Sequence, residues 1–115
     1  MYYIVCMYLG ENIADNGGLR EAYRAYNFYV AANGAEPQLP GLEQFTADQI
    51  FFLSYANLWC GVETPERLEE QILTDPHSPS RFRVIGPLSN NEDFAREFSC
   101  PVGSPMNREN DCILW

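Results

Sequence analysis

The sequence predicts a mainly α fold. Residues 11–33, 46–60 and 64–73 carry helix signals, whereas stretches with the alternating apolar pattern of β-strands are few. The chain has 115 residues, which allows one domain at most. Apolar residues make up 46% of it and charged residues 20%, a composition that is ordinary for a folded protein and does not indicate disorder.

The first predicted helix, residues 11–33, has apolar side chains spaced three and four residues apart. This spacing places them along one face of a helix. The pair Asn33–Gly34 is typical of a helix C-terminus, because glycine readily adopts the left-handed conformation in which many helices end. The apolar positions are Leu19, Ala22, Tyr23, Tyr26, Tyr29 and Val30.

The second predicted helix, residues 46–60, begins at Thr46, a residue type that is favourable as an N-cap. Apolar side chains occur on nearly every side of this helix. A helix without a polar face is expected to be buried on every side. A chain of this length has little material with which to surround it. The apolar residues are Ile50, Phe51, Phe52, Leu53, Tyr55, Leu58 and Trp59.

The rest of the chain contains shorter elements. Thr64 and Pro65 open a polar helix that runs to about Leu73, with proline at its first helical position. Residues 74–91 are rich in proline and serine and are expected to be non-helical, with 81–86 (RFRVIG) as a short extended piece. Asn90 or Asn91 caps a short helix over 92–98, and the tail is expected to be loop with one last turn.

Charge and hydropathy exclude several classes of partner. The net charge of -9 opposes binding to phosphates, so we expect no nucleic-acid partner and no electrostatic docking to anionic lipid. No apolar run approaches the length of a membrane span, so this segment is expected to make no membrane contact. The N-terminus lacks the basic region and cleavage site of a signal peptide.

The four cysteines, Cys6, Cys60, Cys100 and Cys112, show no C-x-x-C spacing, which argues against a zinc knuckle. Composition leaves two readings open, buried free thiols and disulfides in a secreted protein.

Glu11 and Asp15 are the first candidates for chemistry. They are four residues apart, so on a helix they share a face and repel each other. A solvated helix face is the simplest interpretation of this spacing. A zinc site is the alternative, with the Glu11 carboxylate as a ligand and Asp15 orienting a histidine ligand. Gly17 and Gly18 follow, where the lack of side chains would let another element pack closely.

His77 is the only histidine, and it lies between two prolines in the sequence DPHSP. Asp75 could orient its imidazole, and Arg83 could bind a substrate carbonyl or carboxylate through its planar fork. In this reading His77 donates a hydrogen bond to an oxyanion. The alternatives are an exposed loop histidine and a surface salt bridge of Arg83. One histidine does not complete a zinc site, and the chain has no H-E-x-x-H motif.

Several blocks of sequence follow one another in a recognisable order. They are LGENIADNGGL, REAYRAY, LPGLEQFTADQIFFLSYANLWCG, TDPHSPSRFRVIGPLSNNEDFAREFSC and the terminal CILW. Together they strongly resemble the C-terminal end of the neprilysin and endothelin-converting-enzyme family of zinc metalloendopeptidases. The resemblance implies that residues 9–115 are the C-terminal part of a neprilysin-like catalytic domain. Residues 1–8 are then an atypical N-terminal segment, and Cys6 has no family counterpart.

The resemblance implies a role for each polar candidate. Glu11 would be the third ligand of one Zn²⁺ ion whose other ligands lie outside this chain, and Asp15 would orient a histidine ligand. His77 would stabilise the oxyanion of the tetrahedral intermediate, with Asp75 supporting it. Arg83 would hold the substrate backbone.

The family also implies roles for apolar residues and cysteines. Leu58 and Trp59 fall where these enzymes line an apolar specificity pocket. Cys60, Cys100 and Cys112 match family cysteines whose disulfide partners lie upstream.

The H-E-x-x-H helix of the family, with two histidine ligands and the general base, is absent from this sequence. We therefore expect an incomplete C-terminal part of a helical zincin-like catalytic domain, inactive by itself. Its partners would be peptide substrates and the missing N-terminal portion of the same protein. The parent protein would lie at the extracellular face of the plasma membrane or be secreted. The alternatives are a non-enzymatic binding module and a truncated pseudoenzyme.

Overall fold

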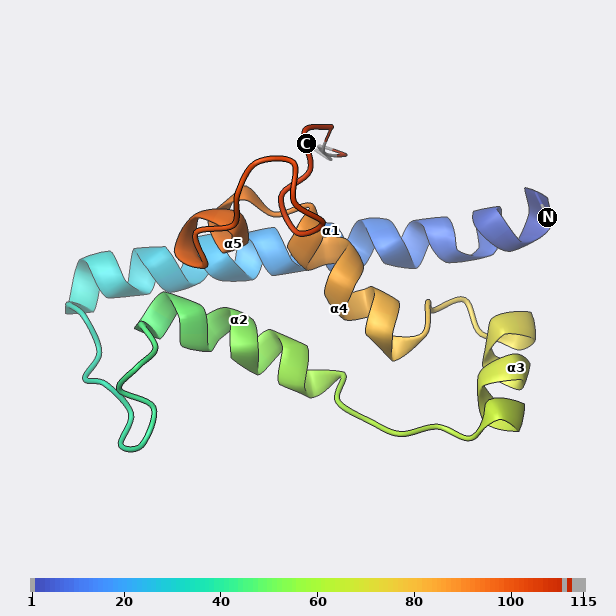
Figure 1. The fold of residues 1–115 in the computed structure, drawn as a ribbon, viewed down its shortest axis with the longest axis horizontal. Coiled ribbons are helices and arrows are strands. Elements are labelled where there is room, and N and C mark those ends of the chain that lie inside the picture. The colour runs from blue at the N-terminus through green and yellow to red at the C-terminus, as the bar shows by residue number, and fades with distance from the viewer. Residues whose placement is uncertain (1, 111, 113–115) are drawn as a thin grey trace.

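The computed structural model describes residues 2–110 and 112, with side chains described from residue 7 onward. The described part has five helices and no β-strand, which confirms the mainly α prediction. Figure 1 shows the long first helix with the other helices arranged along one side of it and across its middle. The helices are α1 (Tyr2–Asn33), α2 (Ala47–Leu58), α3 (Pro65–Thr74), α4 (Ser80–Ser89) and α5 (Glu92–Glu97).

Helix α1 begins at Tyr2, well before the predicted start at Glu11. It ends as predicted: Gly34 has a φ of 89°, and its N–H donates to the Val30 carbonyl at 2.8 Å. The prediction of close packing at Gly18 is wrong for the described structure, because a Cβ there would meet no atom within 4 Å. Leu19 and Tyr23 are the buried residues of this helix.

Helix α2 begins as predicted, with a capping box in which Thr46 and Gln49 each accept a hydrogen bond from the other's backbone N–H. The prediction that it is buried on all sides is wrong. Only Phe52 is fully buried, while Leu53 and Leu58 are 39% and 77% exposed. The physical reason is that α2 packs against α1 and α5 on one side and has no described neighbour on the other (Figure 1).

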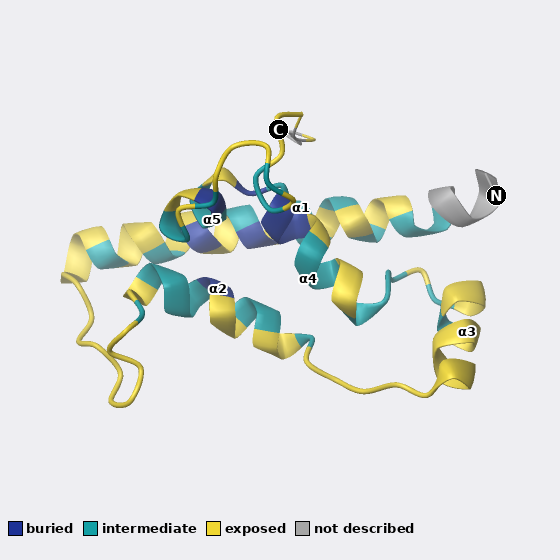
Figure 2. Cartoon of the chain, viewed as in Figure 1, coloured by how far each residue is buried: buried dark blue, intermediate teal, exposed yellow. Residues whose placement is uncertain are grey.

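Helix α3 begins at Pro65 behind the Thr64 cap, as predicted, and ends at Thr74. It contains no buried residue and lies apart from the core (Figure 2). A hydrogen bond from the Tyr8 hydroxyl to the Ile72 carbonyl connects it to α1.

Helix α4 contradicts the sequence prediction, because residues 81–86 are helical and not extended. Val84 and Leu88 lie one helical turn apart and pack into the core, so tertiary packing overrides the local signals of Gly86 and Pro87. Pro87 stands in the last turn and has no N–H to donate to the Arg83 carbonyl. The Tyr55 hydroxyl of α2 donates to that carbonyl instead, at 2.7 Å.

Helix α5 begins behind Asn91, whose side chain accepts from the Phe94 N–H at 2.9 Å, as one of the two predicted caps. The chain then continues as loop through residue 110, with a single bridge between Ser104 and Asn107. The last predicted turn falls partly on residues 111 and 113–115, which lie outside the described residues.

The core forms where α1, α2, α4 and α5 meet, and it is small (Figure 2). Leu19, Tyr23, Phe52 and Leu88 form its buried cluster, and aromatic rings pack around it. The radius of gyration is 16.0 Å, whereas a compact domain of this length has about 13 Å. The described helices include none that is long and apolar enough to cross a membrane.

Candidate functional site

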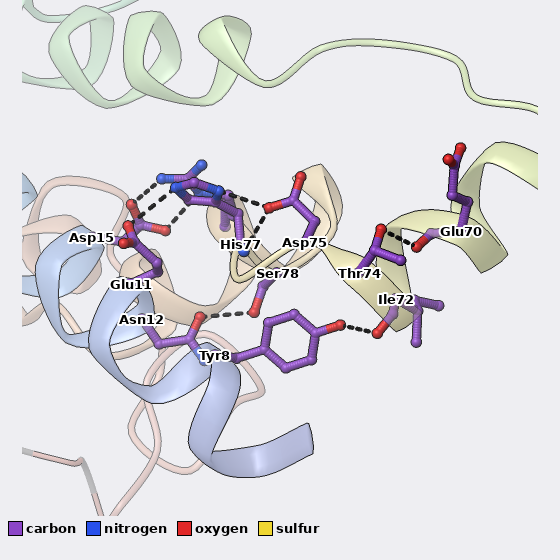
Figure 3. Close-up of polar contacts among 11 residues, drawn as sticks. Tyr8, Glu11, Asn12, Asp15, Glu70, Ile72, Thr74, Asp75, His77 and Ser78 are labelled. Carbon is purple, nitrogen blue, oxygen red and sulfur yellow. Dashed lines mark hydrogen bonds and ion pairs between the residues drawn. The ribbon is translucent and has the colours of Figure 1, made fainter. Parts of the chain in front are cut away.

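Three separate elements bring the predicted polar residues together. Helix α1 supplies Glu11 and Asp15, the loop after α3 supplies Asp75 and His77, and α4 supplies Arg83. Figure 3 shows Glu11, Asp15, His77 and Asp75 facing one another across the gap between α1 and this loop. We refer to these five residues as the polar cluster.

His77 is held between two carboxylates. Its Nδ1 lies 2.8 Å from Asp75 Oδ1, and its backbone N–H donates to the same oxygen at 2.8 Å. Its Nε2 lies 3.2 Å from Glu11 Oε2. The hydrogen bonds from the His77 backbone and ring lower the pKa of Asp75 below its usual value. Asp75 thus contacts both the backbone and the ring of His77, and its role in orienting the imidazole stays a prediction.

The two carboxylates constrain the hydrogen bonding of the imidazole. A neutral imidazole has one N–H and can donate to only one of its two neighbours. An imidazolium donates from both nitrogens and so satisfies Asp75 and Glu11 together. An imidazole that donates from Nδ1 to Asp75 therefore also donates from Nε2 to Glu11 only in its doubly protonated form.

Asp15 and Arg83 form a bidentate pair. Arg83 Nε donates to Asp15 Oδ2 at 2.8 Å, and Nη2 donates to Oδ1 at 2.6 Å. The side chain of Arg83 is 15% exposed and that of Asp15 is 11% exposed. Hydrogen bonding to Asp15 raises the pKa of Arg83 further above its already high usual value. The repulsion expected between Glu11 and Asp15 is thus relieved within this chain, since each carboxylate has its own cationic or hydrogen-bonding partner.

Arg83 is also held from the side of α2. Its guanidinium carbon lies 3.8 Å from the centre of the Trp59 ring, a cation–π distance. Tyr55, one turn earlier, donates to the Arg83 carbonyl. Burial, reinforced by the negative charge of Asp15, raises the pKa of Tyr55 to about 12. The hydroxyl therefore remains a donor at any ordinary pH.

The sequence analysis did not find Tyr55 as part of this site. Its signal was Pro87, four residues after Arg83, because a proline there leaves the Arg83 carbonyl without its helical donor. The missing donor can be recognised only once residues 80–89 are known to be helical.

Asparagines that the sequence analysis also missed connect α1 to the rest of the site. The Ser78 hydroxyl donates to Asn12 Oδ1 at 2.7 Å, and Asn90 Nδ2 donates to Asn16 Oδ1 at 3.0 Å. Asn90 Oδ1 in turn accepts from the Cys112 N–H at 2.7 Å. Asn12 and Asn16 are four residues apart, so their spacing on α1 was the available signal.

The remaining predicted residues lie around the polar cluster or away from it. Trp59 contacts Arg83, whereas Leu58 points into solvent. Cys60 and Cys112 are exposed, Cys100 is partly buried, and no disulfide joins any two of these three residues.

The polar cluster was tested as a metal site by its donor set. Within the described part of the chain, no group of three or more histidine, cysteine, aspartate or glutamate side chains is placed to hold a metal ion. Glu11 is 41% exposed, and its carboxylate has His77 as its hydrogen-bonding neighbour. Asp15 has both oxygens occupied by Arg83. The donor chemistry therefore fits one carboxylate ligand from this chain, Glu11, and not a complete site.

Comparison with known proteins finds consistent matches. The sequence model described as peptidase family M13 matches residues 6–114. Endothelin-converting enzyme 1 of Rattus norvegicus is 60% identical over 107 residues, which cover 93% of this chain and 14% of the relative. Neprilysin-11 of Caenorhabditis elegans is 56% identical over 106 residues, covering 92% of this chain and 12% of the relative.

A solved structure, described as Haemonchus galactose containing glycoprotein complex, superposes with a TM-score of 0.85 at 46% identity. That match covers 90% of this chain and 17% of the other. The chain thus spans about one seventh of the length of the curated relatives that it matches.

Proposed function

The chain belongs to peptidase family M13, and on this premise we propose that residues 9–115 are the C-terminal part of the catalytic domain of a zinc metalloendopeptidase. In this proposal residues 1–8 are an atypical segment before that part. The parent protein hydrolyses peptide bonds in small peptides. This chain contributes one zinc ligand and the side chains that bind and stabilise the reacting peptide.

The observation that carries the proposal is the convergence of the polar cluster. Its members come from three elements, and Asp15 and Arg83 are separated by 68 positions in the sequence. A solvated helix face would not place Glu11 against a histidine and Asp15 against an arginine, both from elements distant in the sequence. Pairs of titratable groups that hold one another in place are typical of catalytic sites.

Each residue of the polar cluster has a proposed task. Glu11 is the zinc ligand. His77 donates a hydrogen bond from Nε2 to the oxygen of the scissile carbonyl as negative charge develops there, and Asp75 holds the imidazole in the donating orientation. The zinc ion, when bound, supplies Lewis-acid polarisation of that carbonyl. Asp15 is proposed to orient a histidine ligand from outside the chain while it fixes Arg83.

Arg83 is proposed to bind the backbone of the peptide substrate. Its pairing with Asp15 uses two of its five N–H groups, which leaves donors for a substrate carbonyl. Leu58 and Trp59, at the C-terminal end of α2, are proposed to line an apolar pocket for a substrate side chain. The exposure of Leu58 supports this role, since a residue that binds substrate cannot be covered by the core.

The missing portion of the same protein is the proposed partner of this chain. Two large apolar side chains of α2 that face solvent here, Leu53 and Leu58, support this, because they are available to be covered by a partner. Cys60, Cys100 and Cys112 are proposed to pair with cysteines outside the chain. This pairing fits a parent that acts at the extracellular face of the plasma membrane or is secreted.

A hybrid enzyme tests the proposal. Residues 9–115 replace the aligned segment of rat endothelin-converting enzyme 1, and the endothelin-converting activity of the hybrid is measured. We expect the hybrid to be active and to lose at least about 100-fold in kcat/KM when His77→Ala removes the oxyanion donor. Equal activity of the folded His77→Ala hybrid, or a folded but inactive parent hybrid, would refute the proposal.

A binding module without catalysis is the second candidate. It is favoured by the exposure of Leu53, Leu58 and Phe28, which a protein partner could cover. The hybrid separates the two candidates, because a binding module has no reason to restore peptide hydrolysis.

A further inference from the structure

The Arg83 carbonyl lies at an interruption in the hydrogen bonding of α4. In a regular helix this carbonyl would accept from the N–H of the residue four positions later. That residue is Pro87, which has no N–H. The Tyr55 hydroxyl takes the place of the missing donor at 2.7 Å. A hydroxyl from a different helix thus completes the backbone of α4 at the residue that carries the guanidinium.

Helix α2 and its C-terminal cap contact both the backbone carbonyl and the guanidinium of Arg83. Tyr55 and Trp59 are four residues apart, and therefore lie on the same face of this helix and its C-terminal turn. Tyr55 binds the backbone carbonyl of Arg83, while the Trp59 ring stacks on its guanidinium at 3.8 Å. Asp15 of α1 also holds the guanidinium, by accepting hydrogen bonds from Arg83 Nε and Nη2. The position of the guanidinium therefore depends on α1 and α2 together.

We propose that Tyr55 is a positioning residue for Arg83, and that its hydroxyl compensates for the backbone donor that Pro87 removes. The positioning role rests on the proposed function of Arg83 in binding the substrate backbone. It differs from a packing role in one respect. A packing role depends on the ring of Tyr55, whereas this role depends on its hydroxyl and on the residue at position 87.

The first experiment measures the position of Arg83 without any catalytic assay. The Nε–H signal of Arg83 is observed by NMR in the full chain and assigned by its loss in Arg83→Lys. In the native chain the signal is expected to be protected from exchange by Asp15. Tyr55→Phe should reduce this protection by about tenfold. Tyr55→Phe with Pro87→Ala should restore it, because alanine supplies the missing N–H.

The variants also separate positioning from loss of structure. Tyr29→Phe is the matched control, since Tyr29 lies on α1 and is 53% exposed, and it should leave the Arg83 signal unchanged. If Tyr55→Phe fails to fold, the double variant decides: a folded double variant with a protected signal supports the proposal. Unchanged protection in Tyr55→Phe, or a double variant without restored protection, overturns it.

The second experiment measures the consequence for the peptidase. In the hybrid enzyme Tyr55→Phe is expected to raise KM about tenfold with kcat nearly unchanged, and Pro87→Ala in the same chain should reverse the increase. A fall in kcat without a change in KM would contradict positioning of a substrate-binding group. An inactive parent hybrid would refute the proposed function, and the NMR result would still decide whether Tyr55 positions Arg83.

Discussion

The pair formed by Asp15 and Arg83 is the strongest electrostatic contact of the polar cluster. Both side chains are largely removed from solvent, so each charge is compensated mainly by the other and little by water. Asp15→Asn leaves the guanidinium without its counter-charge, and we expect a loss of about 3 kcal/mol in the free energy of unfolding. Urea denaturation of the chain measures this.

An exposed pair on the same helix provides the control. Arg24 and Glu21 lie 2.6 Å apart, but both side chains are more than half exposed. Glu21→Gln should therefore change stability by less than about 0.5 kcal/mol. If the two variants destabilise the chain equally, the contact between Asp15 and Arg83 is not the buried pair described here.

Ionisation of Tyr23 and Tyr55 is expected to lower the stability of the chain at alkaline pH. Burial is the main cause that raises the pKa of Tyr23 and of Tyr55 to about 12, and the neighbouring carboxylates Asp48 and Asp15 add to it. In the unfolded chain both hydroxyls ionise near a pH of about 10. Since the unfolded state loses these protons first, stability is fully present below pH of about 10 and falls as the pH rises towards 12.

Unfolding measured between pH of about 8 and 12 checks this direction. The Tyr55→Phe variant, compared with the native chain, should show a shallower loss of stability over the same range. An identical pH dependence in the two proteins would contradict the burial of an ionisable hydroxyl at position 55.

At the residue level the sequence identified the candidates and the contact between Asp75 and His77, but not the partner of Asp15. Glu11, Asp15, Asp75, His77 and Arg83 were found from residue type, spacing and resemblance. The pairing of Asp15 with Arg83 was not found, because it joins positions 68 apart and depends on how α4 crosses α1. Long-range contacts of this kind are set by packing, which no local pattern encodes.

At the level of elements, the starts of α2, α3 and α5 were predictable, whereas the start of α1 and the whole of α4 were not. The caps Thr46, Thr64 and Asn91 each accept a hydrogen bond from the residue three positions later, so the local sequence contains the information. Helix α4 was missed because glycine and proline within it argue against a helix. The core contacts of Val84 and Leu88, together with the Tyr55 hydroxyl, outweigh that preference.

The caps of α2 and α3 should differ in their effect on global stability. Thr46→Ala removes the capping box of a helix that contributes Phe52 to the core, and should lower the free energy of unfolding by about 1 kcal/mol. Thr64→Ala removes a similar cap from α3, which has no buried residue. Because α3 can fray without opening the core, the global effect should be smaller.

Chemical denaturation measures the global effect of each substitution, and amide exchange of α3 measures the local one. Thr64→Ala should accelerate exchange in α3 alone. Equal global losses for the two variants would mean that α3 unfolds together with the core.

The whole molecule is more open than a complete domain of its length. Its radius of gyration is 16.0 Å, and only a few side chains are fully buried. The apolar all-round pattern of residues 46–60 led to the expectation of full burial, and the described chain provides cover on one side only. The sequence thus predicted that the apolar side chains of residues 46–60 need to be buried. The described fold has too few elements to cover all of them.

The isolated chain is expected to have no peptidase activity. In the proposed function it supplies a single carboxylate ligand, Glu11, and its described residues contain no complete metal site. The pure 115-residue chain, incubated with a peptide substrate and Zn²⁺, should release no product above the blank. Cleavage that a chelator abolishes would contradict this expectation.

In the proposed function Glu11 is this chain's ligand to a zinc ion whose other ligands come from the rest of a family M13 catalytic domain. The most direct measurement is the zinc affinity of the hybrid enzyme, determined by titration against a chelator. Glu11→Gln should weaken zinc binding by about 100-fold or more, because a neutral amide replaces an anionic ligand. Glu69→Gln, on the exposed surface of α3, should leave the affinity unchanged. A Glu11→Gln hybrid that binds zinc as tightly as its parent would contradict the account.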